Sequence, residues 1–338
     1  MSRRIRAALV VVIALVAACG SDTDPAATPS SSSTDAPAAT TTPTPPSTSA
    51  PPTTEASVGP RTVVDARGEE VTVESVERII PLDGDVAEVV FALGMGDRVV
   101  ATDISATFPA EADALPEIGY QRALAAEPII GFEPTIVLGT DIAGPPETIA
   151  ALEAVGIPVV IVPREPGPEG PAVKIRAVAD ALGVSDVGAE LADRVQAGIA
   201  EATVEEASGP RAVALYVRGT NVQLVLGEGS GIHWLLEAAG AVDIADELGV
   251  VETEQISAEA ILAAAPEVII VPAIGLDSVG GIDGLLAIDG LGETPAGQSG
   301  AVLSYDDQLM LGNGPRTADF LSALAEDLQE LTTTGATE

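Results

Sequence analysis

The sequence is poor in the side chains that most often carry catalysis or bind metals. Its 338 residues include one cysteine, Cys19, one histidine, His233, and one lysine, Lys174, and only 2% of them are aromatic. A single cysteine excludes an intramolecular disulfide. A lone histidine excludes a zinc- or manganese-transport site, which needs several histidine and carboxylate ligands. Neither a Gly-x-Ser-x-Gly elbow nor a Gly-x-x-x-x-Gly-Lys loop is present, so we expect the protein not to be an enzyme.

Positive charge is also scarce. The chain has 15 lysines and arginines against 51 aspartates and glutamates, which gives a formal net charge of -36. So acidic a chain repels the phosphates of nucleic acids and the head groups of anionic lipids. We therefore exclude both as partners.

The N-terminus predicts export and a lipid anchor. Residues 1–18 carry three arginines, then an apolar run too short to span a bilayer, then small residues, which is the layout of a secretory signal. The stretch 16–20, Val-Ala-Ala-Cys-Gly, resembles a bacterial lipoprotein signal, in which cleavage precedes the cysteine and the thiol receives a diacylglyceryl group. The resemblance implies a protein held by lipid on Cys19 at the outer face of the cytoplasmic membrane. The alternative is an ordinary secretory signal with an incidental cysteine.

A tether follows the signal. Residues 19–60 are nearly all serine, threonine, alanine, proline and aspartate. Such a segment cannot bury enough apolar surface to offset the entropy lost on ordering. We expect a disordered tether, partly stiffened by proline, that holds a folded domain away from the membrane.

The rest of the chain alternates strand-like and helix-like segments. Short β-branched runs such as 135–138, 159–162 and 268–271 read as buried parallel strands, and segments such as 85–93 and 147–154 between them have helical spacing. Asp85 and Glu88 have the spacing of a capping box at the start of the first of these helices. This alternation predicts an α/β fold with helices on both faces of parallel sheets.

An internal repeat divides the folded part into two lobes. Segments 127–134 and 259–266 both begin with glutamate, have two apolar residues starting two positions later, and reach proline seven positions on. Two lobes of similar design follow from this repeat. We predict an N-terminal lobe over 61–166, a helical connector over 167–208 and a C-terminal lobe over 209–338. Within the connector, 171–182 and 187–207 read as two helices, and the second, longer one is expected to join the lobes as a single rigid helix.

From about Arg78 to Leu324 the chain resembles the substrate-binding proteins of bacterial ABC importers for haem, siderophores and cobalamin, and most of all the haem-binding members. The motifs that carry the resemblance are Leu-Asp-Gly-Asp at 82–85, Phe-Ala-Leu-Gly at 91–94, Gly-Tyr-Gln-Arg at 119–122, Gly-Pro-Pro-Glu at 144–147, Gly-Gly-Ile-Asp-Gly-Leu-Leu at 280–286 and Gly-Asn-Gly-Pro-Arg-Thr at 312–317.

The resemblance implies two Rossmann-like lobes with parallel sheets, joined by a single long helix, with the ligand in a cleft between them. It implies a monomer that captures haem as transported ligand and delivers it to a membrane permease and its ATPase. The alternative on the same fold is a binding protein for a ferric siderophore or for cobalamin.

Few residues can serve as axial ligands of ferric haem iron, for which proteins use histidine, tyrosine, cysteine or methionine. The resemblance points to Tyr120, because haem-binding relatives carry an axial tyrosine at this place. Tyr216 ends a predicted strand of the second lobe, and His233 lies in a glycine-rich turn; these are the other two candidates. The alternative for each tyrosine is a packed ring with its hydroxyl bonded to the backbone.

Each candidate tyrosine is followed two positions later by an arginine, Arg122 or Arg218. A nearby guanidinium lowers the pKa of a phenol toward phenolate, the form that binds ferric iron. Arg122, Arg218 and Arg316 are also the expected partners of the haem propionates.

The family docks on its importer through one surface acid on each lobe, and by position these map to Glu127 and Glu259. Two carboxylates spaced across the cleft can pair with arginines of the permease. The alternative is that both acids stabilise the N-termini of their helices.

Overall fold

The structure, a computed structural model, describes residues 59–205, 208–255 and 257–335. The predicted signal, Cys19 and residues 19–58 of the predicted tether lie outside the described residues. Within the described part of the chain, no helix is both long and apolar enough to cross a membrane.

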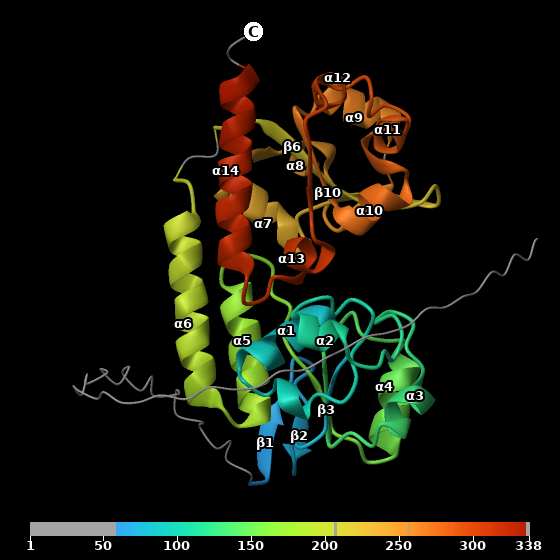
Figure 1. Ribbon diagram of the computed structural model, residues 1–338, viewed down its shortest axis with the longest axis vertical. Coiled ribbons are helices and arrows are strands. Elements are labelled where there is room, and N and C mark those ends of the chain that lie inside the picture. Colours follow the sequence, from blue (N-terminus) through green and yellow to red (C-terminus); the bar gives the residue numbers. More distant parts are fainter. Residues whose placement is uncertain (1–58, 206–207, 256, 336–338) are drawn as a thin grey trace, which may run out of the picture. The chain divides into compact units, whose positions relative to one another are not determined.

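The first lobe contains a three-stranded parallel sheet in the order β3-β4-β5, and an antiparallel hairpin, β1-β2, precedes it (Figure 1). The β-branched runs predicted as buried strands form this sheet, and every residue of β3, β4 and β5 is buried. The elements of this lobe are β1 (Arg61–Val64), β2 (Glu70–Val73), β3 (Ile79–Pro81), α1 (Gly84–Ala92), η1 (Gly96–Arg98), α2 (Ala110–Asp113), α3 (Ala126–Gly131), β4 (Ile136–Gly139), α4 (Pro146–Ala154) and β5 (Val159–Ile161).

The second lobe has a six-stranded mixed sheet in the order β11-β10-β6-β7-β9, with β8 also paired to β6. Its elements are β6 (Arg211–Arg218), β7 (Val222–Leu226), α7 (Gly231–Ala238), β8 (Val242–Asp243), α8 (Ala245–Leu248), β9 (Thr253–Gln255), α9 (Ala258–Ala264), β10 (Val268–Pro272), α10 (Ala273–Ser278), α11 (Gly281–Leu286), α12 (Pro295–Ser299), β11 (Val302–Tyr305), α13 (Asp307–Gly312) and α14 (Thr317–Gly335).

The α/β class is confirmed, but the prediction of parallel strands alone is wrong for the second sheet. Strands β6, β8, β10 and β11 pair in parallel, whereas β7 pairs antiparallel to both β6 and β9. The reason is the connection between β6 and β7. Only residues 219–221 separate them, a link long enough for a hairpin but too short for the crossover that a parallel pair needs.

Two helices, α5 (Gly170–Leu182) and α6 (Ser185–Ala202), connect the lobes. Helix α5 packs on β1 and α1 of the first lobe and on α6, and α6 packs in turn on α14 of the second lobe (Figure 1). One apolar cluster runs from Val73 through Ile175 and Ile199 to Phe320, so the connector shares a core with both lobes. The connector therefore consists of two helices that pack on each other, of which α6 is the longer.

The predicted capping box at α1 is wrong. The helix begins after Asp83, whose side chain makes no capping hydrogen bond. Asp85 instead pairs with Lys174, and Glu88 pairs with Arg316. Both acids face other elements because the second lobe and α5 pack against α1. The spacing of residues within α1 cannot show these contacts with distant parts of the chain.

The close approach of α5 and α6 gives a test of the connector. Gly188 of α6 is buried, and a Cβ at this position would overlap the Cβ of Ala179 on α5. We expect Gly188→Ala to lower the free energy of unfolding by about 1–3 kcal/mol, the usual cost of overpacking. Urea denaturation measures this loss.

Gly131→Ala is the matched control, because Gly131 lies in helix α3 and a Cβ there meets no atom within 4 Å. The same substitution should stabilise by about 0.5–1 kcal/mol through the lower backbone entropy of the unfolded chain. Equal effects at the two positions would contradict the packing described for α5 and α6.

Candidate functional site

The structure brings together two of the predicted ligand residues, Tyr120 and Tyr216, from different lobes. Tyr120 lies in a loop of the first lobe after Gly119, which has φ 109°, and is 37% exposed. Tyr216 lies near the carboxyl end of β6 in the second lobe. The two side chains lie close enough together for Tyr120 to raise the pKa of Tyr216. Two potential oxygen ligands therefore meet where the lobes face each other.

Arg218 lies against Tyr216, but on the face of its ring. The guanidinium carbon is 4.3 Å from the ring centroid, a cation–π contact. The same guanidinium forms an ion pair with Asp307, whose carboxylate also accepts a hydrogen bond of 2.9 Å from the backbone N–H of Ile274. Asp307 was missed in the sequence, although it lies two residues after the end of β11, and functional side chains often lie at the carboxyl ends of strands.

The pKa of Tyr216 is raised above that of a free phenol. Burial of the hydroxyl is the largest cause, and the neighbouring Tyr120 and the charge of Asp307 act in the same direction. The charge of Arg218 lowers the pKa of Tyr216, as the sequence predicted, but burial outweighs it. The expectation of a net lowered pKa is therefore wrong for the ligand-free protein.

Buried carboxyl groups lie beneath the Tyr120 loop. Asp103 accepts hydrogen bonds from the backbone N–H and the hydroxyl of Ser105, and burial raises its pKa to about 7. Asp83, at the carboxyl end of β3, is 1% exposed, and burial together with the charge of Asp85 raises its pKa to about 8. Both groups are therefore partly protonated near pH 7, which reduces the repulsion among these acids.

Arg122 is exposed, and its recorded partner is Asp141, whose pKa it lowers by its charge. The main partner of Asp141 is Arg164, which follows β5 and approaches to 2.8 Å. The pKa of Arg164 is raised first by this hydrogen bond and also by the charges of Asp85 and of Glu252, a residue of the second lobe. Arg164 is thus a guanidinium between the lobes that sequence reasoning missed.

Arg316 is placed away from the two tyrosines. Its Nε and Nη2 atoms lie 3.1 and 2.9 Å from the two carboxylate oxygens of Glu88, which is 4% exposed, and its guanidinium stacks 3.7 Å over the ring of Phe108. Phe91, Phe108 and Arg316 line a pocket of about 720 Å³ at this junction. In this structure Arg316 joins the second lobe to the first, a role that its motif did not predict.

Two more contacts complete the junction between the lobes. The side-chain amide of Gln308 donates to the carbonyl oxygens of Gly84 and Phe108 at 2.8 and 3.0 Å and accepts from the N–H of Phe108 at 2.9 Å. Lys174, 1% exposed, donates to Asp85 and, at 2.6 Å, to the carbonyl oxygen of Gly312. The only lysine of the chain therefore lies where the connector meets both lobes.

His233 belongs to a separate cluster. Its Nδ1 atom lies 3.0 Å from Oδ2 of Asp243, and its neighbours are Glu237 and Asp246. Burial lowers the pKa of His233, but the hydrogen bond with Asp243 and the nearby acids raise it overall. No contact recorded among the described residues joins His233 to Tyr120 or Tyr216.

Glu127 and Glu259 both lie exposed in the first turns of their helices, α3 and α9. Neither has a recorded ion pair or side-chain hydrogen bond within the described ranges. Their position agrees both with a docking role and with the helix-end alternative.

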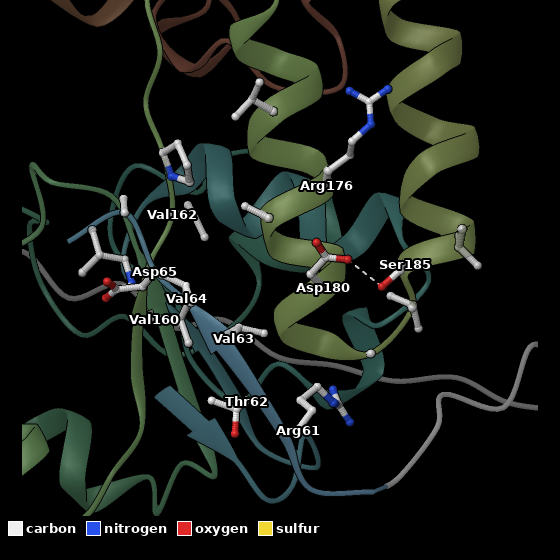
Figure 2. A pocket seen from close by; sticks show the side chains of 18 of the residues that line it. Arg61, Thr62, Val63, Val64, Asp65, Val160, Val162, Arg176, Asp180 and Ser185 are labelled. Atoms are coloured by element: carbon white, nitrogen blue, oxygen red, sulfur yellow. Dashed lines mark hydrogen bonds between the residues drawn. The ribbon is translucent and has the colours of Figure 1, made fainter. Parts of the chain in front are cut away.

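A larger pocket, of about 1030 Å³, lies between β1, β5, α5 and α6 (Figure 2). Its polar groups include Arg61, which donates to the carbonyl oxygen of Ala181 at 3.1 Å, and Asp180, which accepts from the Ser185 hydroxyl at 2.6 Å. Several of these polar groups are already paired, and none of the predicted site residues lines this pocket.

Comparisons with known proteins agree with the resemblance seen in the sequence. A family model described as periplasmic binding protein matches residues 79–309. The periplasmic heme-binding protein RhuT from Roseiflexus sp. RS-1, in apo form, is 44% identical, with a TM-score of 0.73 over 76% of this chain and 99% of that one. The heme binding protein HmuT is 34% identical, with a TM-score of 0.74 over 80% of this chain and 90% of that one.

Curated relatives match a shorter stretch. A vitamin B12-binding protein of Vibrio parahaemolyticus is 29% identical over 86 residues, which is 25% of this chain. The match spans about a third of that relative's length, 31%.

The contact between Tyr216 and Arg218 predicts how this phenol titrates. Because the pKa of Tyr216 is raised, the ultraviolet difference titration between the wild type and Tyr216→Phe should have its midpoint above about pH 10, the value of a free phenol. Arg218→Leu should move this midpoint further up, because the guanidinium charge lowers the pKa.

Arg194→Leu serves as control, since Arg194 is an exposed arginine of α6 and should leave the midpoint unchanged. A Tyr216 midpoint at or below that of free tyrosine would show that burial does not dominate at this phenol.

Proposed function

Because this chain belongs to the periplasmic binding protein family, we propose that it captures haem outside the cytoplasm and delivers it to the permease of an ABC importer. The observation that carries this proposal is the meeting of Tyr120 and Tyr216, one from each lobe, beside Arg218. Two solved heme-binding proteins share 34–44% identity over most of their length, which supports haem as the ligand.

Ferric haem would enter between the two tyrosines. Its iron would take a phenolate as ligand, so Tyr216 or Tyr120 would release its proton to solvent. Arg218 offsets the negative charge that appears on the phenolate of Tyr216, and this stabilisation grows when haem excludes water from the contact. Because the phenol of Tyr216 is protonated before haem binds, the cost of removing this proton reduces the net free energy of haem binding.

Two solved single variants of HmuT carry alanine at this spacing. One replaces a tyrosine, and the other replaces an arginine two positions further along the chain. Tyr216 and Arg218 have the same spacing.

Arg122 and Arg164 are the arginines that we assign to the haem propionates. Arg122 is exposed near Tyr120, and Arg164 pairs with the exposed carboxylate of Asp141. A propionate can replace Asp141 on a guanidinium without leaving a buried charge unpaired. Arg316 is less suited, because its release would leave the buried Glu88 without a partner.

Glu127 and Glu259 are our candidates for docking on the permease. Each is exposed at the start of a short helix, one on each lobe. Arginines of the permease would pair with both carboxylates only when the lobes have the spacing of the loaded protein. The ATPase partner of the permease would then drive transport, while this chain carries out no reaction of its own.

The anchor and the organisation of the chain complete the proposal. Cys19 would carry the lipid, residues 19–60 would act as the tether, and lobes over 61–166 and 209–338 with a connector over 167–208 would work as a monomer. The position of Cys19 directly after small residues supports the anchor.

Cobalamin is a second candidate ligand. The observation that favours it is the match of 86 residues to vitamin B12-binding proteins. Such a ligand brings its own metal coordination, so neither tyrosine would be required as a metal ligand.

Visible absorption titration of the purified protein with ferric haem tests the function. We expect saturable binding with a tyrosinate-to-iron charge-transfer band. The double variant Tyr120→Ala with Tyr216→Ala loses the iron ligand, so it should lose this band. Its haem affinity should fall at least about tenfold, because a loss of only about 1.4 kcal/mol of binding free energy already gives a tenfold change.

Tyr305→Phe is the matched control. The hydroxyl of Tyr305 donates to Asp327 at 2.5 Å within the second lobe, so its removal should leave the haem spectrum unchanged. A wild-type haem spectrum in the double tyrosine variant would refute tyrosine ligation, and saturable cobalamin binding without haem binding would support the second candidate.

Charge reversal tests the docking residues. Glu127→Arg and Glu259→Arg should each slow haem delivery to the cognate importer in proteoliposomes about tenfold or more, because like charges meet across the interface. Haem affinity should not change, since both side chains are exposed away from the tyrosines. Glu190→Arg, an exposed acid of α6, is the control, and full uptake with both docking variants would exclude this role.

A further inference from the structure

One histidine and two carboxylates come together on the second lobe, outside the haem site proposed above. His233 and Glu237 are one turn apart on α7, and Asp246 lies in the first turn of α8. One ligand atom of each lies within 4.8 Å of the others. The two carboxylate side chains are 52% and 55% exposed, so small rotamer changes can bring their oxygens closer to a shared ion.

A buried fourth residue orients the imidazole. The side chain of Asp243 is fully buried in β8, where Oδ1 accepts from the backbone N–H of Ala245 at 2.9 Å and Oδ2 lies 3.0 Å from Nδ1 of His233. This bond favours the tautomer with the proton on Nδ1 and leaves the Nε2 lone pair free. Nε2 has no hydrogen bond among the described residues and lies 3.8 Å from Oε2 of Glu237, whereas Oδ1 of Asp246 lies 4.0 Å from Nδ1 of the same ring.

This arrangement has the chemistry of a metal site with its supporting residue. Histidines that bind metals commonly donate their other ring N–H to a carboxylate, which fixes the ring and makes the free nitrogen more basic. We propose that His233, Glu237 and Asp246 bind a zinc-class divalent cation, with Asp243 as the positioning residue.

The three ligand atoms limit which metal ions can bind at this site. One imidazole nitrogen and two carboxylate oxygens suit Zn²⁺ and similar first-row ions, whereas Ca²⁺ and Mg²⁺ prefer oxygen ligands alone. Three protein ligands leave a fourth tetrahedral position for water. The ion would tie α7 to α8 in the second lobe and would neutralise part of a dense group of acids.

Isothermal titration with ZnCl₂ tests the site. The whole chain is used without a polyhistidine tag and with Cys19→Ser, so that neither a tag nor the thiol adds a zinc ligand. We expect one saturable zinc site per chain that a similar concentration of Mg²⁺ does not block. Asp243→Asn should weaken zinc binding about 10–100-fold, the usual effect of losing such a supporting carboxylate.

Variants separate ligation from folding. Glu237→Gln with Asp246→Asn changes two half-exposed side chains, so the fold should survive while zinc binding weakens at least about tenfold. Glu190→Gln with Glu201→Gln removes the same charge from exposed positions of α6 and should leave zinc affinity unchanged. Equal zinc affinity in these two double variants would overturn the proposal.

Nuclear magnetic resonance gives a direct readout, because the chain has only one imidazole. Zinc should shift the Nε2 resonance of His233 in a saturable way, with the midpoint found by calorimetry. An unchanged imidazole spectrum at saturating zinc would overturn the site. The haem spectrum of the ligand variants should match the wild type, so failure of this proposal and failure of haem binding are separate results.

Discussion

The buried ion pair between Glu88 and Arg316 is the contact on which the arrangement of the two lobes depends. Glu88 is 4% exposed and meets the guanidinium of Arg316 with both carboxylate oxygens, so its charge is compensated although water barely reaches it. Removal of one partner from such a pair typically costs about 3–5 kcal/mol, because the other charge stays buried and unpaired. Gln308 and Lys174 add uncharged and charged hydrogen bonds to the same junction.

This junction and the proposed haem site share one short helix. Asp307, at the start of α13, holds Arg218 beside Tyr216, and the next residue, Gln308, bonds to the backbone of Gly84 and Phe108 in the first lobe. A ligand that displaces Arg218 from Asp307 therefore acts on the residue adjacent to a contact between the lobes. This is a physical route by which binding can change the lobe spacing that the permease meets.

Four positive charges of this acidic chain lie where the lobes meet. Lys174, Arg164, Arg218 and Arg316 all lie at or near this boundary, and each has a carboxylate partner. Elsewhere the excess of acids faces solvent, where water screens their repulsion. The buried Asp103 is instead close to neutral, because burial raises its pKa to about 7.

The sequence by itself determined the α/β class, the two-lobed repeat and the short set of ligand candidates, because strand and helix periodicity and rare residues such as Tyr120 and Tyr216 are local properties. Only the tertiary structure decided which groups meet. Arg316 and Glu88 are 228 residues apart in the chain, and Arg218 and Asp307 are 89 apart, so no local spacing could report either pair. The raised pKa of Tyr216 likewise depends on burial between lobes, which forms only when both lobes have folded and packed together.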